Sequence, residues 1–522
     1  MIPAIQALGY AWFGWGTFVL LVQSVGVYNI FKRYSSVPKP PAVPSLPKDD
    51  IPHVTVIRPA KGLEPYLYEC LLSTFQQTYP KDKLTVYFCV SSKDDAAYAV
   101  MKRVVDEHPG YDARIFVEDD DPALHQDGTT MEHMGPNPKI RNLSRAYREV
   151  KGDIVWVADC NVWLSRHTAG HMVDRLCGFG PDGKRSTPFK LVHQLPIVVD
   201  TVSSLPRDSS ETQALLSGSI EASTDDDHRA HISIMSQGGG RLEEMFMCTT
   251  HAKFYSAINT VGVAPCIVGK SNMFRKSHLD IVTDPSQNPV LSSTSNALTG
   301  LDYFSNYICE DHLIGDLLWK SSIPGHRNHG LNWGGLVVQP VAGMSVKAYA
   351  GRRVRWLRAR KWTVLLATLV EPGIESFLCC FFLSFGLTTV PWFDERFGIP
   401  QTWGSLLKCW TVGVTAWMFL DRMVSNRLHA GYSIDIDENT PAFAKGSKRG
   451  GAERRPFGQW LLAWVGREGL AMPIWTWAVL LGATVSWRGK EFRVRSDMSV
   501  VAADQTRNGR GSANGRASGK ID

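Results

Sequence analysis

The chain contains the apolar run Ile154-Val155-Trp156-Val157-Ala158, and Asp159 follows it directly. The run is short, rich in β-branched residues and apolar at every position, which is typical of a strand buried on both faces. Ligands of parallel sheets bind beyond the carboxyl ends of such strands. The run therefore predicts a buried strand that delivers the Asp159 carboxylate to the edge of a sheet.

The sequence around this run alternates between strand and helix patterns. Three further strands are expected at Val54–Ile57, Leu84–Val90 and Ala113–Val117. The spacing of apolar residues predicts helices at Tyr66–Thr78, Ala96–Glu107 and Asn142–Val150. Strands that alternate with helices indicate an α/β domain with a mostly parallel sheet. Asp95 follows one of these strands and is expected near the same edge as Asp159.

Long apolar segments flank this domain. Tyr10–Ile30 has roughly 20 uncharged residues, enough to cross the ~30 Å hydrocarbon core of a bilayer. Because Lys32-Arg33 follows it, the positive-inside rule predicts a retained anchor with a lumenal N-terminus and a cytosolic domain. Thr363–Val390 and Gly404–Leu420 are each long enough to cross. The sequence leaves open whether Gln459–Trp487, which carries charged residues, crosses, re-enters or lies at the interface.

These patterns predict five parts of the chain. They are a lumenal N-terminus with a transmembrane anchor (1–34), a proline-rich linker (35–53), a catalytic domain (54–362), a C-terminal helical membrane region (363–495) and a disordered tail (496–522). Within the catalytic domain, three stretches rich in Asp, Ser, Thr and Gly are expected to be partly disordered loop insertions. They lie near 118–136, 200–241 and 286–300.

Charge and cysteine content exclude several classes of protein. The net charge of +6 is small for 522 residues, and six Lys and Arg residues gather in Arg352–Lys361, just before an apolar segment. This placement indicates cytosolic anchoring rather than a nucleic-acid interface. The ten cysteines form no C-x-x-C pair, so neither a disulfide framework nor a structural zinc site is expected.

Three aspartates, Asp95, Asp159 and Asp311, stand in contexts that suit catalysis. Transfer from a nucleotide sugar needs a divalent metal to neutralise the diphosphate, and a base to remove a proton from the acceptor hydroxyl. Carboxylates can serve both needs. For each aspartate taken singly, however, a helix cap or a turn is the more frequent role.

A fourth element is the sequence Arg352-Arg353-Val354-Arg355-Trp356. It places planar guanidinium groups, which bind phosphate through two hydrogen bonds, beside an aromatic ring. On its own, such a sequence is more typical of a basic patch that anchors to anionic lipid. Its position after three acidic sites and immediately before an apolar segment favours a more specific interpretation.

The order Asp95, Asp159, Asp311 and then R-x-x-R-W resembles the D, D, D, (Q/R)xxRW signature of family-2-like glycosyltransferases, which have a GT-A-type fold. The finer sequence is similar to that of the ceramide glucosyltransferases, over about Tyr10 to Arg495. This similarity is carried by Ile57-Arg58-Pro59-Ala60-Lys61-Gly62, Tyr79-Pro80, Asn137-Pro138-Lys139-Ile140-Arg141-Asn142-Leu143, Val192-His193-Gln194-Leu195-Pro196, Glu310-Asp311, and Arg355-Trp356 followed by Glu371-Pro372.

The resemblance implies transfer of glucose from UDP-glucose to the primary hydroxyl of ceramide, with inversion, on the cytosolic side of the Golgi membrane. It also implies a role for each matching position. Asp311 would be the general base, and Asp159 would hold the metal, Mg²⁺ or Mn²⁺, together with the diphosphate. This chain has Asp159-Cys160-Asn161 instead of a full D-x-D, so most metal ligands would come from the donor and water.

The remaining implied contacts involve the donor and the acceptor pocket. They are Asp95 to the uridine, Lys139 to the nucleotide, His193 to the donor, Arg352 and Arg355 to the departing UDP, and Trp356 as a wall of the acceptor pocket. For His193, an ordinary core histidine is an equally good interpretation.

Glu371 and Glu375 are predicted from their spacing to share one face of an apolar helix, because residues four apart are neighbours on a helix. An acidic residue inside the membrane is a functional hypothesis by default. We expect these two glutamates to line the path by which ceramide enters.

Two rival functions stay open at this point. One is another membrane glycosyltransferase, either a processive polysaccharide synthase or a different lipid-linked sugar transferase. The C-terminal region has at most about three apolar segments, fewer than a polymer channel needs, and this argues against the synthase. The other rival is a non-catalytic scaffold or lipid-transfer protein, which the presence of all the acidic sites disfavours.

Overall fold

The computed structural model describes residues 4–125, 134–180, 183–201, 234–291, 298–451, 455–487 and 490–502. The disorder predicted within the three loop insertions, and most of the predicted tail, lies outside these residues.

The predicted parallel strands form one half of an eight-stranded sheet. They are β1 (Val54–Pro59), β2 (Leu84–Val90), β3 (Asp112–Val117) and β4 (Ile154–Ala158). All three pairings among them are parallel, in the order β3-β2-β1-β4. Every residue of β1 and β2 is buried, as their apolar composition predicts. The expected mostly parallel α/β domain is confirmed.

The other half of the sheet is mixed in direction. It contains β5 (Trp163–Leu164), β6 (Phe189–Asp200), β7 (Ser271–Arg275) and β8 (Arg327–Val341), and the full order is β3-β2-β1-β4-β7-β6-β8-β5. Strand β7 is antiparallel to both β4 and β6, whereas β6 and β8 are parallel. Because Ala158 pairs with Ser271, the residue before β7 lies beside Asp159.

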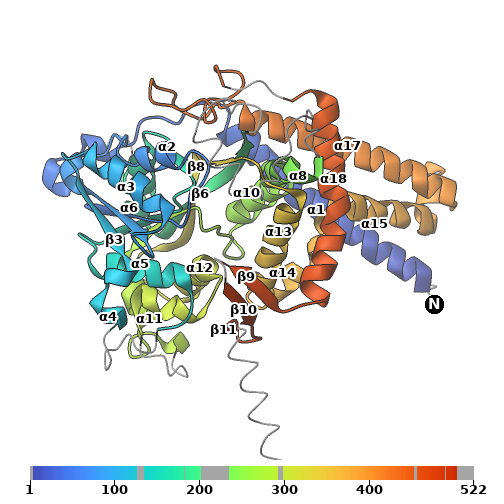
Figure 1. Ribbon diagram of the computed structural model, residues 1–522. Helices are drawn as coiled ribbons and strands as arrows, with labels where there is room; N and C mark the ends of the chain where they lie inside the picture. Colours follow the sequence, from blue (N-terminus) through green and yellow to red (C-terminus); the bar gives the residue numbers. More distant parts are fainter. Residues whose placement is uncertain are drawn as a thin grey trace, which may run out of the picture.

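Helices cover both faces of this sheet (Figure 1). They are α2 (Leu67–Leu72), α3 (Ala96–Asp106), α4 (Pro122–His125), α5 (Pro138–Arg148), α6 (Thr168–Cys177), α11 (Lys276–Thr283) and α12 (Glu310–Lys320). Helix α5 begins earlier than the apolar pattern predicts, because the Asn137 side chain caps it by accepting hydrogen bonds from Lys139 N and Ile140 N.

Three long helices project from the other side of the molecule (Figure 1). Helices α1 (Ala4–Arg33), α15 (Ser376–Thr389) and α17 (Trp403–His429) pack side by side, and the short α16 (Pro391–Phe397) joins the last two. Helix α1 is long and apolar enough to cross a membrane, in line with the predicted anchor. The segments Leu365–Ile374 and Ser376–Thr389 would pass the same test together, but they meet at a bend of 75°.

This bend corrects the prediction for Glu371 and Glu375, which do not share a continuous helix face. Helix α14 (Leu365–Val370) is followed by the 3-10 turn Glu371–Ile374, and Glu375 has an extended backbone just before α15. Pro372 and Gly373 lie at the break. A proline costs a helix one backbone hydrogen bond, and glycine loses the most entropy in a helix, so the helix stops here.

The predicted boundary between a catalytic and a membrane region is not clean. Three helices from the middle of the catalytic domain are α8 (Ile234–Gln237), α9 (Gly239–Phe246) and α10 (Ala252–Val261), with the π-helical turn Met247–His251 between the last two. Helix α10 packs against α1, the π-helical turn against α17, and α8 and α9 against the C-terminal helix Val346–Arg360. The expected insertion at 200–241 therefore ends before 234. A Cβ on Gly26 of α1 would lie 1.9 Å from the Lys253 carbonyl oxygen, so glycine is required where α1 crosses α10.

The C-terminal region also differs from its prediction. Helix α13 (Val346–Arg360) precedes α14, and α18 (Phe457–Trp475) runs steeply across the three long helices (Figure 1). A π-helical turn (Thr476–Leu480) and three strands follow, β9 (Thr484–Trp487), β10 (Lys490–Val494) and β11 (Val500–Ala502). The stretch 459–487 is therefore not one helix, and the predicted boundary of the tail at 496 is wrong, because β11 pairs with β10.

Candidate active site

Asp159 lies at the carboxyl end of β4 between two lysines. Lys270 Nζ is 2.9 Å from Asp159 Oδ2, and Lys139 Nζ is 3.3 Å from Asp159 Oδ1. Lys270 reaches this place because Asp159 N donates a backbone hydrogen bond of 3.0 Å to Lys270 O, which continues the β4–β7 pairing. Lys139 comes from the capped first turn of α5. Sequence reasoning found Asp159 and Lys139 but missed Lys270.

Lys139 joins Asp159 to the first turn of α12. Its ammonium is also 3.0 Å from Glu310 Oε1, and the Lys139 and Glu310 side chains are only 12% and 7% exposed. Asn137 fixes the same junction, since its Nδ2 donates to Tyr307 O at 2.5 Å and to Glu310 Oε2 at 3.4 Å. The segments that begin α5 and α12 are therefore locked together beside the end of β4.

The charges in this cluster shift one another's pKa values. Burial raises the pKa of Asp159, but Lys139 and Lys270 outweigh burial and hold the pKa well below its ordinary value. Burial lowers the pKa of Lys139, but Asp159, Glu310 and Asp311 outweigh burial and raise it. Burial also raises the pKa of Glu310, against the opposing charge of Lys139. At neutral pH the cluster keeps Asp159 as a carboxylate and Lys139 as an ammonium.

Asp311 differs from its neighbour Glu310, although both begin α12. No ion pair joins Asp311 to a side chain of the described residues, and it lines a cavity together with Lys139, Gly269, Leu191 and Ile314. Burial raises its pKa, against the charge of Lys139 and the backbone N–H of His312. A Cβ on Gly269 would lie 2.8 Å from Asp311 Oδ2, so only glycine leaves room for this carboxylate. Asp311 is thus the acid of this cluster that can accept a proton from a ligand.

The side-chain oxygens at this site could bind a metal ion only with help from other ligands. No group of three or more His, Cys, Asp or Glu side chains gathers as a metal site among the described residues. Asp159 offers one carboxylate, and Asn161 Oδ1 lies 3.2 Å from the ammonium of Lys270. These oxygens fit Mg²⁺ or Mn²⁺ if the ion takes its other ligands from phosphate and water and if Lys270 moves aside.

Asp95 is the N-cap of α3, as the alternative interpretation had it. Its Oδ1 accepts hydrogen bonds from Ala97 N at 2.9 Å and from Gly62 N at 2.8 Å. The second bond joins α3 to the loop after β1, at the same sheet edge as Asp159. These bonds give Asp95 a structural role as a cap, and its predicted role with the uridine stays a prediction.

His193 is a fully buried residue of β6. Its Nδ1 lies 2.5 Å from the Tyr255 hydroxyl, and its backbone pairs with Asn272 of β7. Burial, together with the nearby His329, lowers the pKa of His193 far below its ordinary value, so the imidazole is neutral at physiological pH. This surrounding favours the core-histidine interpretation.

The R-x-x-R-W sequence lies on α13 and divides between two faces. Arg352 Nε is 2.9 Å from Glu243 Oε1, and Arg352 and Arg355 line a groove beside Thr484 and Ser486 of β9. The Trp356 ring has its centre 4.9 Å from the guanidinium carbon of Arg352 and packs on the buried cluster of Val198 and Met247. Their predicted roles toward the departing UDP and the acceptor pocket stay predictions.

Arg360 is the arginine of α13 whose charge reaches α12. With burial as the main cause, it helps to lower the pKa of His312 to about 4, and it lowers the pKa of the Cys309 thiol against burial. It also pairs with Glu371, to which Arg353 Nη2 donates at 3.1 Å. The sequence signature did not single out Arg360, because it lies four residues beyond Trp356.

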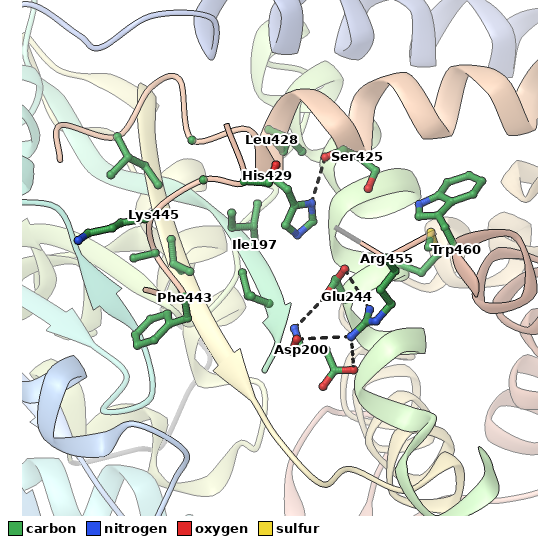
Figure 2. A pocket seen from close by; sticks show the side chains of 18 of the residues that line it. Ile197, Asp200, Glu244, Ser425, Leu428, His429, Phe443, Lys445, Arg455 and Trp460 are labelled. Carbon is green, nitrogen blue, oxygen red and sulfur yellow. Dashed lines mark hydrogen bonds and ion pairs between the residues drawn. The ribbon is translucent and has the colours of Figure 1, made fainter. Parts of the chain in front are cut away.

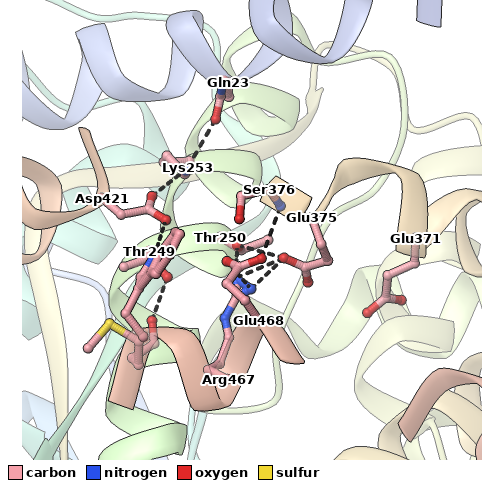
Figure 3. Close-up of polar contacts among 12 residues, drawn as sticks. Gln23, Thr249, Thr250, Lys253, Glu371, Glu375, Ser376, Asp421, Arg467 and Glu468 are labelled. Atoms are coloured by element: carbon pink, nitrogen blue, oxygen red, sulfur yellow. Dashed lines mark hydrogen bonds and ion pairs between the residues drawn. The ribbon is translucent and has the colours of Figure 1, made fainter. Parts of the chain in front are cut away.

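The predicted acceptor residues line a small cavity. Glu371 and Glu375 face it together with Phe246, Tyr349 and Trp475. Glu375 is buried, pairs with Arg467 and accepts a hydrogen bond of 3.1 Å from Thr250 (Figure 3). The cavity is therefore apolar on one side and lined by paired charges on the other.

A second buried polar group lies deeper among the long helices. Lys253 Nζ is 2.5 Å from Asp421 Oδ1 and 3.0 Å from Gln23 Oε1, and Trp464 Nε1 donates to Asp421 Oδ2 at 2.9 Å (Figure 3). The Lys253 and Asp421 side chains are 0% exposed. One ion pair thus ties α1, α10, α17 and α18 together.

A larger cavity lies at the far end of β6, between α17, α18 and the loop that follows α17 (Figure 2). Its acidic residues, Asp200 and Glu244, are both held by Arg455, at 2.6 Å and 3.5 Å. Because this arginine already compensates both acids, the cavity has no unpaired carboxylate like that of Asp311.

Comparison with known proteins places this geometry among glycosyltransferases. The profile of the family described as Glycosyl transferase family 21 matches residues 17–202 and 231–500. The chain is 55% identical to the ceramide glucosyltransferase of Pyricularia oryzae, over 98% of both chains. It is 48% identical to that of Gibberella zeae, over 97% of this chain and 95% of the other.

Similarity to solved structures is more distant. The mannosyltransferase PcManGT from Pyrobaculum calidifontis, in complex with GDP-Man and Mn²⁺, is 14% identical with a TM-score of 0.38, over 82% of this chain and 98% of that chain. Glucosyl-3-phosphoglycerate synthase from Mycobacterium tuberculosis, with UDP and Mn²⁺, is 14% identical with a TM-score of 0.26, over 56% and 71%.

Proposed function

Because the chain belongs to glycosyltransferase family 21, we propose that it transfers glucose from UDP-glucose to the primary hydroxyl of ceramide, with inversion at the anomeric carbon. The observation that carries this proposal is the unpaired Asp311 carboxylate beside the cluster of Lys139, Asp159 and Lys270. The names of the full-length relatives supply the sugar and the acceptor. The GT-A-type domain predicted from the sequence agrees with this family.

The donor binds with its diphosphate at the end of β4. Lys139 and Lys270 turn from Asp159 toward the phosphate oxygens, and Asp95 contacts the uridine from the neighbouring strand end. A Mg²⁺ or Mn²⁺ ion, held by Asp159 and the donor, would supply further positive charge for the leaving diphosphate. Arg352 and Arg355 of α13 add positive charge that favours the departing UDP. His193 is a buried core residue of β6, and we assign it no direct contact with the donor.

Asp311 is the general base of a single displacement. Its carboxylate removes the proton of the ceramide primary hydroxyl as that oxygen forms a bond to the anomeric carbon, while the bond from that carbon to the diphosphate breaks and UDP leaves. Glu310 is held by Lys139 and Asn137, so it positions the lysine and is not available as the base.

Ceramide approaches from the membrane, because removing its chains from a bilayer costs about 0.8 kcal/mol per CH₂. The chain lies in the Golgi membrane with the sheet on the cytosolic side and α1 as an anchor. The cavity lined by Glu371, Glu375 and Trp475 receives the polar head of ceramide, and Trp356 lies near its wall. The Glu371 pair with Arg360 connects this cavity to α12.

The test is product formation in membranes from cells that lack glucosylceramide synthesis. The wild type is compared with Asp311→Asn, supplied with labelled UDP-glucose and a short-chain ceramide. The expected result is a labelled lipid from the wild type and a loss of about 10²- to 10⁴-fold in the variant. Asp316→Asn is the matched control, since Asp316 lies on the same helix and pairs with Lys320. A polymer in place of a lipid product would support the synthase, and equal activity of both proteins would remove Asp311 as the base.

A further inference from the structure

The small C-terminal sheet, β9 to β11, lies against the segments that carry the candidate chemistry. Its strands are antiparallel in the order β11-β10-β9. In Figure 1 the small sheet lies next to α12 and α14. It is far from β3, the strand at the opposite edge of the large sheet. It is therefore placed to act on the first turn of α12, where Asp311 lies.

The sheet contacts the residues just before α12. Ile308 belongs to a buried cluster that contains at least one residue from each strand of the sheet. These residues are Val485 of β9, Phe492 and Val494 of β10, and Val500 of β11. Phe492 is 1% exposed and is the largest side chain of the cluster that is fully buried. Tyr307 also forms an antiparallel bridge with Ser499. Two consecutive residues, Tyr307 and Ile308, are thus held by the sheet shortly before Asp311.

The sheet is fixed equally firmly to α13. Ala359 packs on the same cluster. Arg358 donates hydrogen bonds to Thr484 O at 2.7 Å and Trp477 O at 3.1 Å, and Lys361 Nζ donates to Val479 O at 2.7 Å. The bonds to Trp477 O and Val479 O satisfy carbonyls of the preceding π-helical turn, and the bond to Thr484 O joins α13 to β9. Basic residues of α13 thus hold both the sheet and the turn that leads into it.

These contacts leave Asp311 supported from two directions. Gly269 borders the Asp311 carboxylate on the side of the lysine cluster. The buried cluster of Ile308 and Phe492 supports the backbone just before Asp311. A general base loses efficiency steeply when its geometry loosens, since a displacement of about 1 Å can cost about 100-fold in rate. The packing of the sheet therefore bears on the rate of proton transfer.

We infer that the sheet Thr484–Ala502 positions Asp311 for proton transfer, through the buried cluster that Phe492 shares with Ile308. This inference rests on the proposed role of Asp311 as the base. Phe492 is a positioning residue and touches neither the donor nor the acceptor. Two measurements, one of activity and one of local order, distinguish an error in this inference from an error in the proposed function.

The experiment compares Phe492→Ala, Phe492→Leu and Phe443→Ala in the full-length enzyme. Phe443 is the matched control, because it is also a buried phenylalanine (6% exposed) but belongs to a different cluster. In Phe492→Ala we expect kcat to fall about 10- to 100-fold, with KM for UDP-glucose within about twofold of the wild type. Phe492→Leu restores most of kcat. Phe443→Ala lowers the Tm to a similar extent but keeps kcat per folded enzyme within about twofold.

Hydrogen exchange of the backbone amides of residues 309–314 provides the second measurement, which requires no turnover. Faster exchange is expected in Phe492→Ala and not in Phe443→Ala. Unchanged exchange in Phe492→Ala, or equal losses of kcat in both alanine variants, would overturn the positioning role. Faster exchange with an unchanged kcat would uphold the packing but show that it does not affect proton transfer, and this too would overturn the positioning role. A wild type that forms no labelled lipid would instead contradict the proposed function.

Discussion

The protein buries two groups of charged side chains, and they differ in one respect. At the sheet edge, Lys139, Lys270 and Asp159 leave Asp311 without an ionic partner, on the wall of a cavity. Among the long helices, the buried charges just described are all paired: Lys253 with Asp421, and Arg467 with Glu375 and Glu468. Buried charge alone therefore does not mark a catalytic site. We propose that the unpaired acid beside a cavity is the member with the catalytic role.

If this distinction is right, breaking the helical group costs stability. In Lys253→Met, Asp421 stays buried without its partner, and we expect a loss of about 3–5 kcal/mol in the free energy of unfolding. The measurement is thermal unfolding of the purified protein in detergent. The double variant Lys253→Met, Asp421→Leu should recover most of the loss, because two apolar groups then replace the pair.

The control for this prediction is Lys408→Met. Lys408 is exposed on α17, the same helix as Asp421, and its loss should leave stability within about 0.5 kcal/mol of the wild type. Equal unfolding midpoints for Lys253→Met and Lys408→Met would remove the structural role of the buried pair.

Breaking the group at the sheet edge should cost rate instead. Lys270→Met leaves Asp159 paired with Lys139, so we expect a small change in Tm. The positive charge that faces the leaving diphosphate is lost, and kcat should fall by about 10²-fold. Steady-state kinetics with UDP-glucose check this, beside Lys276→Met, whose lysine pairs with Asp280 on α11. If Lys270→Met lowered the Tm as much as Lys253→Met and left kcat unchanged, Lys270 would stabilise the fold and have no role in catalysis.

Substitutions of Glu371 and Glu375 test whether acids that are already paired with arginines can also bind a substrate. If the cavity that they line receives the head of ceramide, Glu371→Gln and Glu375→Gln should each raise KM for ceramide about 5- to 10-fold, which corresponds to one hydrogen bond worth about 1 kcal/mol. KM for UDP-glucose should not change. An unchanged KM and rate for ceramide in both variants would leave these residues with their structural pairs alone.

The smallest effect concerns pH. Burial raises the pKa of Asp311 above its ordinary 3.8, so its base form is lost at a higher pH than for an exposed aspartate as the solution is acidified. The acid limb of kcat/KM should therefore lie above pH 3.8. Lys139→Met should move that limb further up, because the lysine's charge lowers the Asp311 pKa. A downward shift in the variant would show that another group controls the limb.

The first half of the large sheet could be predicted from sequence because its strands are continuous apolar runs. The bounds of β2 and β4 agree with the prediction residue for residue. Strands β7 and β8 carry polar residues and glycines, such as Asn272 and Gly334, and have no regular alternation. Their partners lie far away in the sequence, so long-range pairing rather than local pattern determines them.

The same limit applies to the site. Asp159, Lys139 and Asp311 were predicted to act together, and the structure brings them into one cluster. Lys270 escaped prediction because it precedes a strand of five residues with only two apolar ones in its interior. The C-terminal sheet was missed because its strands follow an apolar segment that reads as helix. Lys270 and the C-terminal sheet matter because of where the fold places them, and local sequence patterns do not show that placement.

The crossing of α1 and α10 also has a consequence for biosynthesis. Gln23 receives its hydrogen bond from Lys253, 230 residues later in the chain. At translation speeds of about 5–20 residues per second, roughly 10–50 s pass between the synthesis of these two residues. During that interval the first helix has reached the ribosome exit with an unsatisfied amide on its surface. Assembly of this protein must therefore keep the first helix available for a partner that is made 230 residues later.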